Sequence, residues 1–119
     1  MTGIVSMRLN ALWWWIDRWL KSSAYMDMTL EEQGAYRNLL DAATLRGGAL
    51  PADERILAKA SGDALRWKAL RPIVMRHFVK GDDGCYHNET LDEVIKQSAR
   101  RAEKQRAYRE GLKRGNGKA

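Results

Sequence analysis

Three side chains in the second half of the chain are of types that bind zinc. Cys85 and His87 are two positions apart, and His77 lies ten positions before His87. A structural zinc site needs four ligands, usually in paired short spacings. One Cys-x-His pair with a distant histidine falls short of that set. The sequence therefore predicts no metal site and no cofactor, and these residues are typical of a hairpin with polar tips.

Acidic side chains occur as adjacent pairs, which raises the question of general acid–base catalysis. Neighbours in a helix point about 100° apart, so such pairs do not converge on one bound atom. They are typical of helix N-termini and of turns. No phosphate-cradling glycine loop and no serine beside a base is evident, so we expect that the protein is not an enzyme. The pairs are Glu31 with Glu32, Asp53 with Glu54, and Asp82 with Asp83.

Basic side chains concentrate at the C-terminal end. The net charge of the 119 residues is +6, yet residues 94–119 hold nine basic side chains against Glu103 and Glu110, so residues 1–93 carry a net charge of −1. A near-neutral body with a basic arm predicts a polyanionic partner, and we expect DNA. The alternative is a solvated helix laced with local ion pairs. The candidate contacts in the arm are Lys96, Arg100, Arg101, Lys104, Arg106, Arg109, Lys113 and Arg114.

Local signals place helices before and after one short hairpin. Thr29 to Glu32 form a capping box that starts a helix, and Gly47 with Gly48 stops it. Gly34 inside this helix predicts a close approach by the tryptophan-rich segment. Residues 49–51 form a short extended connection, and a second helix runs from Glu54 to Ser61.

Asp63 is predicted to cap a third helix that runs through Phe78. On a helical wheel its exposed side holds Lys68, Arg71, Met75 and Arg76. The two arginines and the lysine are candidate contacts to phosphates or base edges. Because helix–turn–helix pairs place their second helix in the major groove, we expect this helix to contact DNA.

Residues 77–88 predict the hairpin, with Lys80 near a phosphate. Thr90 to Glu93 form a second capping box, which opens the last helix. Its apolar stripe fades beyond Ala102, so the helix is expected to leave the body. Gly111, Gly115 and Gly117 predict a frayed end.

Four of the five tryptophans lie within residues 13–19. They could stack single-stranded bases, anchor the chain to a membrane or close the core. Few basic residues are interleaved with them, so we favour packing on the core. The predicted structural core comprises Trp13, Trp15, Trp19, Tyr36, Leu39, Leu40, Trp67 and Phe78.

The remaining composition indicates a cytoplasmic protein. Cys85 is the single cysteine, so no intrachain disulfide is expected. The longest apolar run, residues 11–16, is far shorter than the ~20 residues of a membrane helix. The first ten residues lack the apolar region of a signal peptide. No membrane partner is expected.

Several motifs together resemble the YdaU-like family of phage and prophage proteins. They are the aromatic cluster, TLEEQGAYRNLL at 29–40, RGGALP at 46–51, and DDGCYHNETLDE at 82–93. The resemblance covers roughly residues 13–105. It implies a winged-helix-like domain of phage replication modules, in the cytoplasm of a bacterial host, and most members of the family are uncharacterised.

We therefore expect a mainly α (α+β) fold. Residues 13–98 form a winged-helix-like helix-turn-helix domain with a small β-hairpin wing, residues 1–12 a poorly ordered extension, and residues 99–119 a basic helical arm. The functional hypothesis is a non-enzymatic DNA-binding accessory of phage replication that also contacts a phage or host replication protein. The alternatives are a protein-interaction module, such as an adaptor or inhibitor of a host or defence complex, and a transcriptional regulator.

Overall fold

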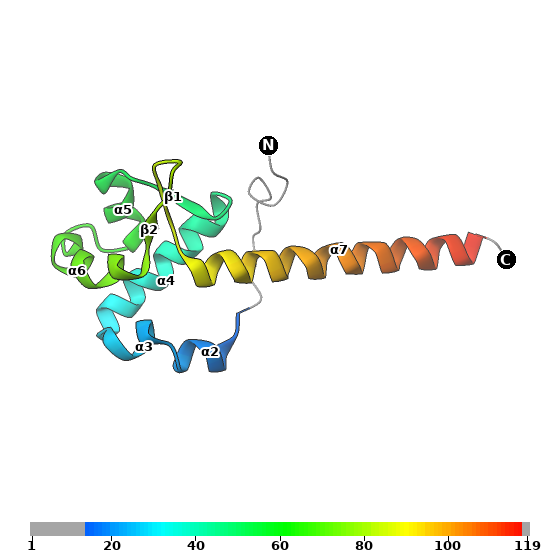
Figure 1. Ribbon diagram of the computed structural model, residues 1–119, viewed down its shortest axis with the longest axis horizontal. Coiled ribbons are helices and arrows are strands. Elements are labelled where there is room, and N and C mark those ends of the chain that lie inside the picture. The colour runs from blue at the N-terminus through cyan, green and yellow to red at the C-terminus, as the bar shows by residue number, and fades with distance from the viewer. Residues whose placement is uncertain (1–13, 118–119) are drawn as a thin grey trace.

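The computed structural model describes residues 14–117 and is mainly helical (Figure 1). Trp13 and the predicted extension over residues 1–12 lie outside the described residues. In chain order the elements are α2 (Ile16–Leu20), α3 (Ser23–Asp27), α4 (Leu30–Leu45), β1 (Ala49–Pro51), α5 (Glu54–Ser61), α6 (Trp67–Val74), the 3₁₀ turn η1 (Met75–His77), β2 (Val79–Lys80), β3 (Cys85–His87) and α7 (Glu89–Gly117).

Helix α4 runs through the middle of the body, and both of its ends follow the sequence signals. Its capping box is present, because the Thr29 hydroxyl accepts from the Glu32 amide at 3.2 Å and the Glu32 carboxylate accepts from the Thr29 amide at 2.8 Å. At the other end Gly47 and Gly48 have φ of 94° and 115°. The Gly48 amide donates to the Ala43 carbonyl at 2.7 Å, which closes the last turn as glycine C-caps do.

The inner face of α4 forms the centre of the core. Tyr36, Leu39 and Leu40 are buried there, and Trp67 and Phe78 bury against them from α6 and the segment after η1. The expectation for Gly34 is wrong. Gly34 is exposed, and a Cβ built on it would meet nothing within 4 Å, so no element approaches it closely.

The third helix begins later than predicted and is shorter. Residues 64–66 form a turn, in which the Asp63 carboxylate accepts from the Arg66 amide at 3.2 Å, and α6 starts only at Trp67. After Val74 the chain tightens into η1. A 3₁₀ turn has 3.0 residues per turn rather than 3.6, so side-chain directions shift there. Met75 is consequently buried, whereas the sequence placed it on the exposed side.

A small antiparallel sheet closes the other side of the body. The predicted hairpin is present as β2 and β3, which pair Val79 with His87 and Lys80 with Tyr86. The connection over residues 49–51 is more than a linker, because β1 also pairs with β3 and Leu50 lies opposite Tyr86. The strand order is β1-β3-β2.

Helix α7 starts one residue before the predicted capping box. Asn88, not Thr90, caps it: the Asn88 side-chain oxygen accepts from the Leu91 amide at 2.8 Å. Leu91, Val94, Ile95 and Ala99 are buried, and burial then stops. The rest of α7 projects away from the body as one continuous helix to Gly117 (Figure 1).

The tryptophans pack only partly as predicted. Trp19 packs on the core as expected, Trp15 is only half-buried, and Trp14, which was not among the predicted core residues, also packs on the core. Trp19 stacks on Tyr36 with ring centroids 5.6 Å apart, and Trp14 packs beside Trp19 and against the core. Trp15 is half-buried, with the Arg18 guanidinium 4.9 Å from its ring centre. Helix α2 begins at Ile16, so Trp14 and Trp15 precede it and Trp19 lies on it.

Candidate nucleic-acid interface

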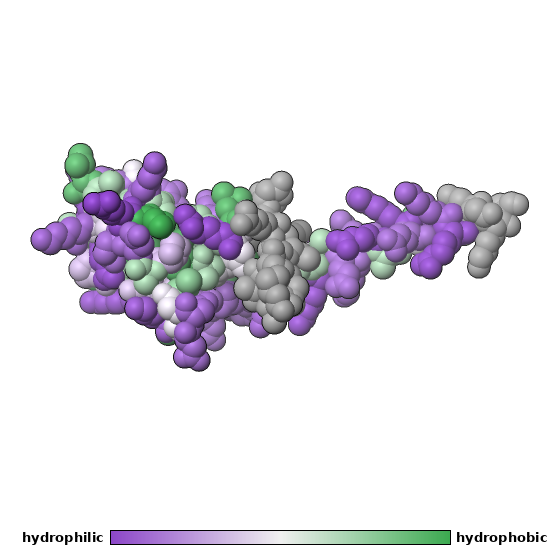
Figure 2. Space-filling view, turned by 90° about the horizontal axis from the view of Figure 1, so that it is seen from above, coloured by the Kyte–Doolittle hydropathy of each residue, from purple (hydrophilic) through white to green (hydrophobic). Residues whose placement is uncertain are grey.

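The part of α7 that projects from the body, residues 100–117, is called the arm. Each residue from Arg100 to Arg114 is exposed to solvent. Figure 2 shows the arm as a hydrophilic projection from the body. Residues 100–114 include seven basic side chains and only two acidic ones. Arg100, Arg101, Lys104, Arg106, Arg109, Lys113 and Arg114 thus all lie on this one rod, as the charge pattern predicted.

The cations of the arm are arranged around its axis. Glu103 and Glu110 are seven residues apart, so they share one side of the helix. Tyr108 and Leu112 lie near the opposite side, where they are 68% and 50% exposed. Basic side chains flank that strip on both sides. A phosphate backbone can therefore meet cations over most of the circumference of the arm.

Arg71 is not a free contact, contrary to the sequence prediction. Its guanidinium makes a two-pronged ion pair with Glu54 of α5, at 2.7 and 3.0 Å, and contacts the Tyr86 hydroxyl at 3.4 Å. The Trp67 indole also donates to Glu54, at 3.2 Å. The hydrogen bond from Arg71 holds the pKa of Glu54 below its usual value. Arg71 therefore fixes α6 to α5 and β3, and its charge is neutralised locally.

The other predicted cations of the body remain on the surface. Lys68 of α6, Arg76 of η1 and Lys80 of β2 are exposed, and so is Lys96, on the part of α7 that packs on the body. Figure 1 shows α6 at the opposite end of the long axis from the tip of the arm. The structure therefore does not gather the predicted contacts into one patch. It leaves an arm and a smaller group near α6.

Two further arginines of the body face carboxylates. Arg18 pairs with Glu93 at 2.8 Å, which ties α2 to the base of α7, and Arg66 pairs with Glu31 at 2.6 Å. The hydrogen bond from Arg18 lowers the pKa of Glu93. These long-range pairs have no signal in local sequence, and they neutralise the charges of Arg18 and Arg66 on the body.

A buried polar cluster lies on the body at the start of α7. The Asn88 amide donates to the Tyr36 hydroxyl at 3.0 Å and to the His77 carbonyl at 2.8 Å, in addition to capping α7. Burial raises the pKa of Tyr36. Asn88 is 3% exposed, so these bonds form away from water. Sequence reasoning missed this residue, although an asparagine just before a helix is a recognised cap signal.

Other site chemistries find little support in the described part of the chain. His87 contacts Asp83 at 2.9 Å across the hairpin turn. Within residues 14–117 no group of three or more His, Cys, Asp or Glu side chains is placed to hold a metal ion. None of the described helices is both long and apolar enough to cross a membrane.

Comparison with known proteins places the body in a family. No curated protein and no solved structure gives a significant match. The family match that exists covers α2 through the packed part of α7 and ends at Lys96, before the arm begins. Over residues 14–96 the chain matches, and therefore belongs to, the family described as protein of unknown function (DUF1376).

Proposed function

We propose that this protein is a non-enzymatic DNA-binding accessory protein of phage or prophage replication, and that the arm is its main contact with DNA. The observation that carries the proposal is the exposed arm, because residues 100–114 hold seven basic side chains and only two acidic ones. No side chain from Arg100 to Arg114 is buried, so this excess of positive charge lies in solvent. It has the features of an electrostatic contact with phosphates.

The dimensions of the arm suit this role. At a rise of 1.5 Å per residue, its 18 residues extend over roughly 27 Å, about the length of eight base pairs. Each phosphate that a lysine or arginine neutralises releases condensed counterions. The arm would therefore bind without reading sequence, and its affinity would fall steeply as salt increases.

The order of elements in the body supports a winged-helix assignment. The chain runs helix α4, strand β1, helices α5 and α6, then the β2–β3 hairpin, and β1 pairs with β3. In this assignment α6 is the recognition helix and the hairpin is the wing. Lys68, Arg76 and Lys80 are the exposed cations that would make a second contact. Arg71 then positions α6 rather than touching DNA.

The assignment to phage replication rests on the resemblance of the motifs to YdaU-like proteins.

A protein-interaction module is the second candidate, and a specific observation favours it. Leu30 is 83% exposed and Leu65 is 99% exposed, and each is the neighbour of one member of the Glu31–Arg66 ion pair. Exposed apolar side chains around such a pair suit a protein partner. Loss of a co-purifying replication protein in Leu65→Ser would support this second contact.

The test of DNA binding is a salt titration with matched variants. Replacing Arg106, Arg109 and Lys113 by glutamine removes three cations from the arm. On duplex DNA we expect the log–log salt slope to weaken by about 2.7, because each phosphate contact contributes about 0.9. The control replaces three exposed cations of the body by glutamine: Arg46, the C-cap of α4, and Arg55 and Lys59 of α5. Equal slopes for the two triple variants would rule out the arm as the main contact.

A further inference from the structure

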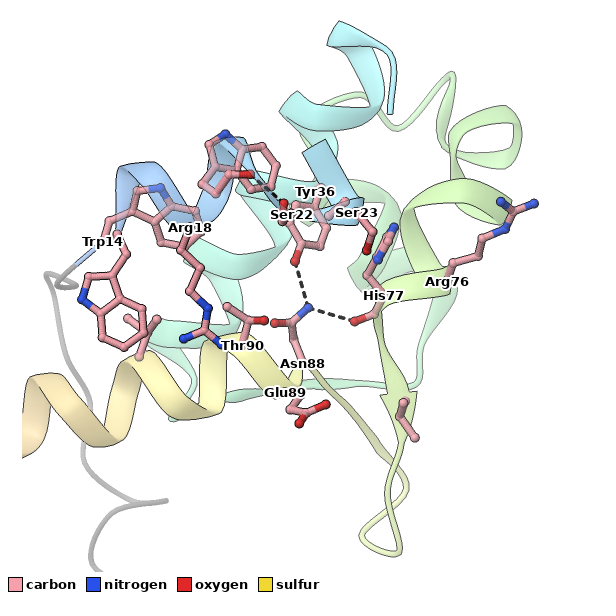
Figure 3. A pocket seen from close by; sticks show the side chains of 15 residues that line it. Trp14, Arg18, Ser22, Ser23, Tyr36, Arg76, His77, Asn88, Glu89 and Thr90 are labelled. Carbon is pink, nitrogen blue, oxygen red and sulfur yellow. Dashed lines mark hydrogen bonds between the residues drawn. The ribbon is translucent and has the colours of Figure 1, made fainter. Parts of the chain in front are cut away.

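A pocket opens beside the first turns of α7, the helix that continues into the arm. It has a volume of about 310 Å³ and lies between α2, α3, η1 and the first turns of α7 (Figure 3). Indole rings of Trp14, Trp15 and Trp19 line one side of it. The volume is at the small end of the range for ligand sites in proteins. Flat aromatic walls of this kind favour a flat, aromatic occupant.

The deep side of the pocket is polar. Tyr36, His77 and Asn88 line it, and Figure 3 shows the Asn88 amide bonded to the Tyr36 hydroxyl and the His77 carbonyl. The His77 Nε2 atom is buried, and no hydrogen-bond partner for it lies within the described chain. Because this atom has almost no accessible surface, it is not a contact for an occupant of the pocket.

The charged side chains around the pocket determine which chemical class of occupant fits it. Arg18 and Arg76 line it, but so does Glu89, and Arg18 is already paired with Glu93. A small anion would therefore meet a carboxylate as well as the arginines. An uncharged aromatic group avoids that conflict and fits the indole-lined side of the pocket.

The pocket lies on the same helix as the proposed DNA contact, and its last lining residue, Val94, is six residues before the arm begins at Arg100. Glu89, Thr90 and Val94, which line it, belong to the same helix as the arm. A single strand whose phosphates follow the arm toward the body would bring its bases to the mouth of the pocket. We infer that the pocket takes one unpaired nucleobase of a single strand held by the arm, a proposal that rests on the DNA-binding function above.

The experiment compares two single strands with equal numbers of phosphates, an oligothymidylate and an abasic strand of the same length. Stacking of one base predicts that the full-length protein binds the oligothymidylate about 10-fold more tightly than the abasic strand. Tryptophan fluorescence should be quenched by the first strand and not by the second. This second readout needs no variant. Equal affinity for the two strands would overturn the inference while leaving phosphate binding by the arm intact.

A substitution that fills the pocket can be compared with a control substitution on the same helix. Ser23 lines the pocket at the exposed start of α3, whereas Met26 of the same helix is 74% exposed and lies outside it. Ser23→Phe should reduce the preference for the base-bearing strand to less than about 2-fold, and Met26→Phe should keep it near 10-fold. A Ser23→Phe protein that is folded and keeps the preference would overturn the inference. If neither strand binds at low salt, the proposed function itself fails, and the inference fails with it.

Discussion

Arg71 of the body and Arg109 of the arm have the same side chain but opposite surroundings. Arg71 is held between Glu54 and Tyr86, and its charge is neutralised where it stabilises α6. Arg109 lies on an exposed helix whose nearest acidic residue in sequence, Glu110, points about 100° away. The difference teaches that counting cations is a poor guide to a nucleic-acid contact. Their partners decide whether a charge is available to a phosphate.

The same contrast applies to the two halves of α7. Up to Ala99 the helix buries Leu91, Val94 and Ile95 against the body, and its start is fixed by Asn88. Beyond Ala99 no side chain from residue 100 to residue 114 is buried. The first half is therefore part of the fold, and the second half contributes charge but little to the stability of the body. The predictions below probe that division.

The largest effect on stability is expected at the start of α7, in the half of the helix that packs on the body. Asn88→Ala removes the cap of α7 and leaves the Tyr36 hydroxyl and the His77 carbonyl without their buried donor. We expect the free energy of unfolding to fall by about 2–4 kcal/mol, from a lost cap and unsatisfied polar groups. Asn88→Ser should lose less, because its hydroxyl can still cap the helix. Chemical denaturation measures both, and equal losses for the two variants would show that the cap contributes nothing and that the bonds to Tyr36 and His77 carry the whole effect.

Two glycine substitutions test the same contrast between body and arm, with smaller expected changes in the free energy of unfolding. Gly34 and Gly111 are both helical, and a Cβ on either would meet nothing within 4 Å. Gly34→Ala should raise the free energy of unfolding by about 0.5–1 kcal/mol, because alanine is the better helix former. Gly111→Ala should increase helicity by circular dichroism without changing the unfolding transition. A shift of that transition by Gly111→Ala would mean that the arm packs on the body.

The smallest effect concerns the pair that fixes α6. Glu54→Gln weakens the contact with Arg71, and because the two side chains are 57% and 36% exposed, the loss should be about 0.5 kcal/mol at neutral pH. The pKa of Glu54 is lowered in the folded state, so the pair stabilises the fold fully above its ordinary value of 4.5. That contribution disappears as pH falls through the folded pKa. Unfolding curves for Glu54→Gln and the parent protein should therefore converge below pH 4.5, and a constant difference would contradict this role.

Features encoded over a few residues were predictable from the sequence. The capping box at Thr29, the stop at Gly47 and Gly48, the β2–β3 hairpin and the mainly helical fold are all present. The cationic arm also followed from local composition. Each of these depends on neighbours within about six residues, which is the range that sequence patterns describe.

Features that depend on distant partners were missed. Arg71 meets a glutamate 17 positions away, and Asn88 meets a tyrosine 52 positions away. Both Asn88 and Thr90 have side chains that can cap a helix, and the additional bonds of Asn88 to Tyr36 and His77 favour the earlier start. Strand β1 is only three residues long and has no pattern of its own, so its pairing with β3 was not visible.

The most direct test of the division between body and arm is a chain that ends at Ala99. This truncation keeps every buried residue of α7 and removes the arm. We predict that the free energy of unfolding changes by less than about 0.5 kcal/mol, as for surface changes, while the salt slope of duplex binding weakens by several units at about 0.9 per lost phosphate contact. A shortened protein that stays folded and binds DNA with an unchanged salt slope would contradict the assignment of DNA binding to the arm.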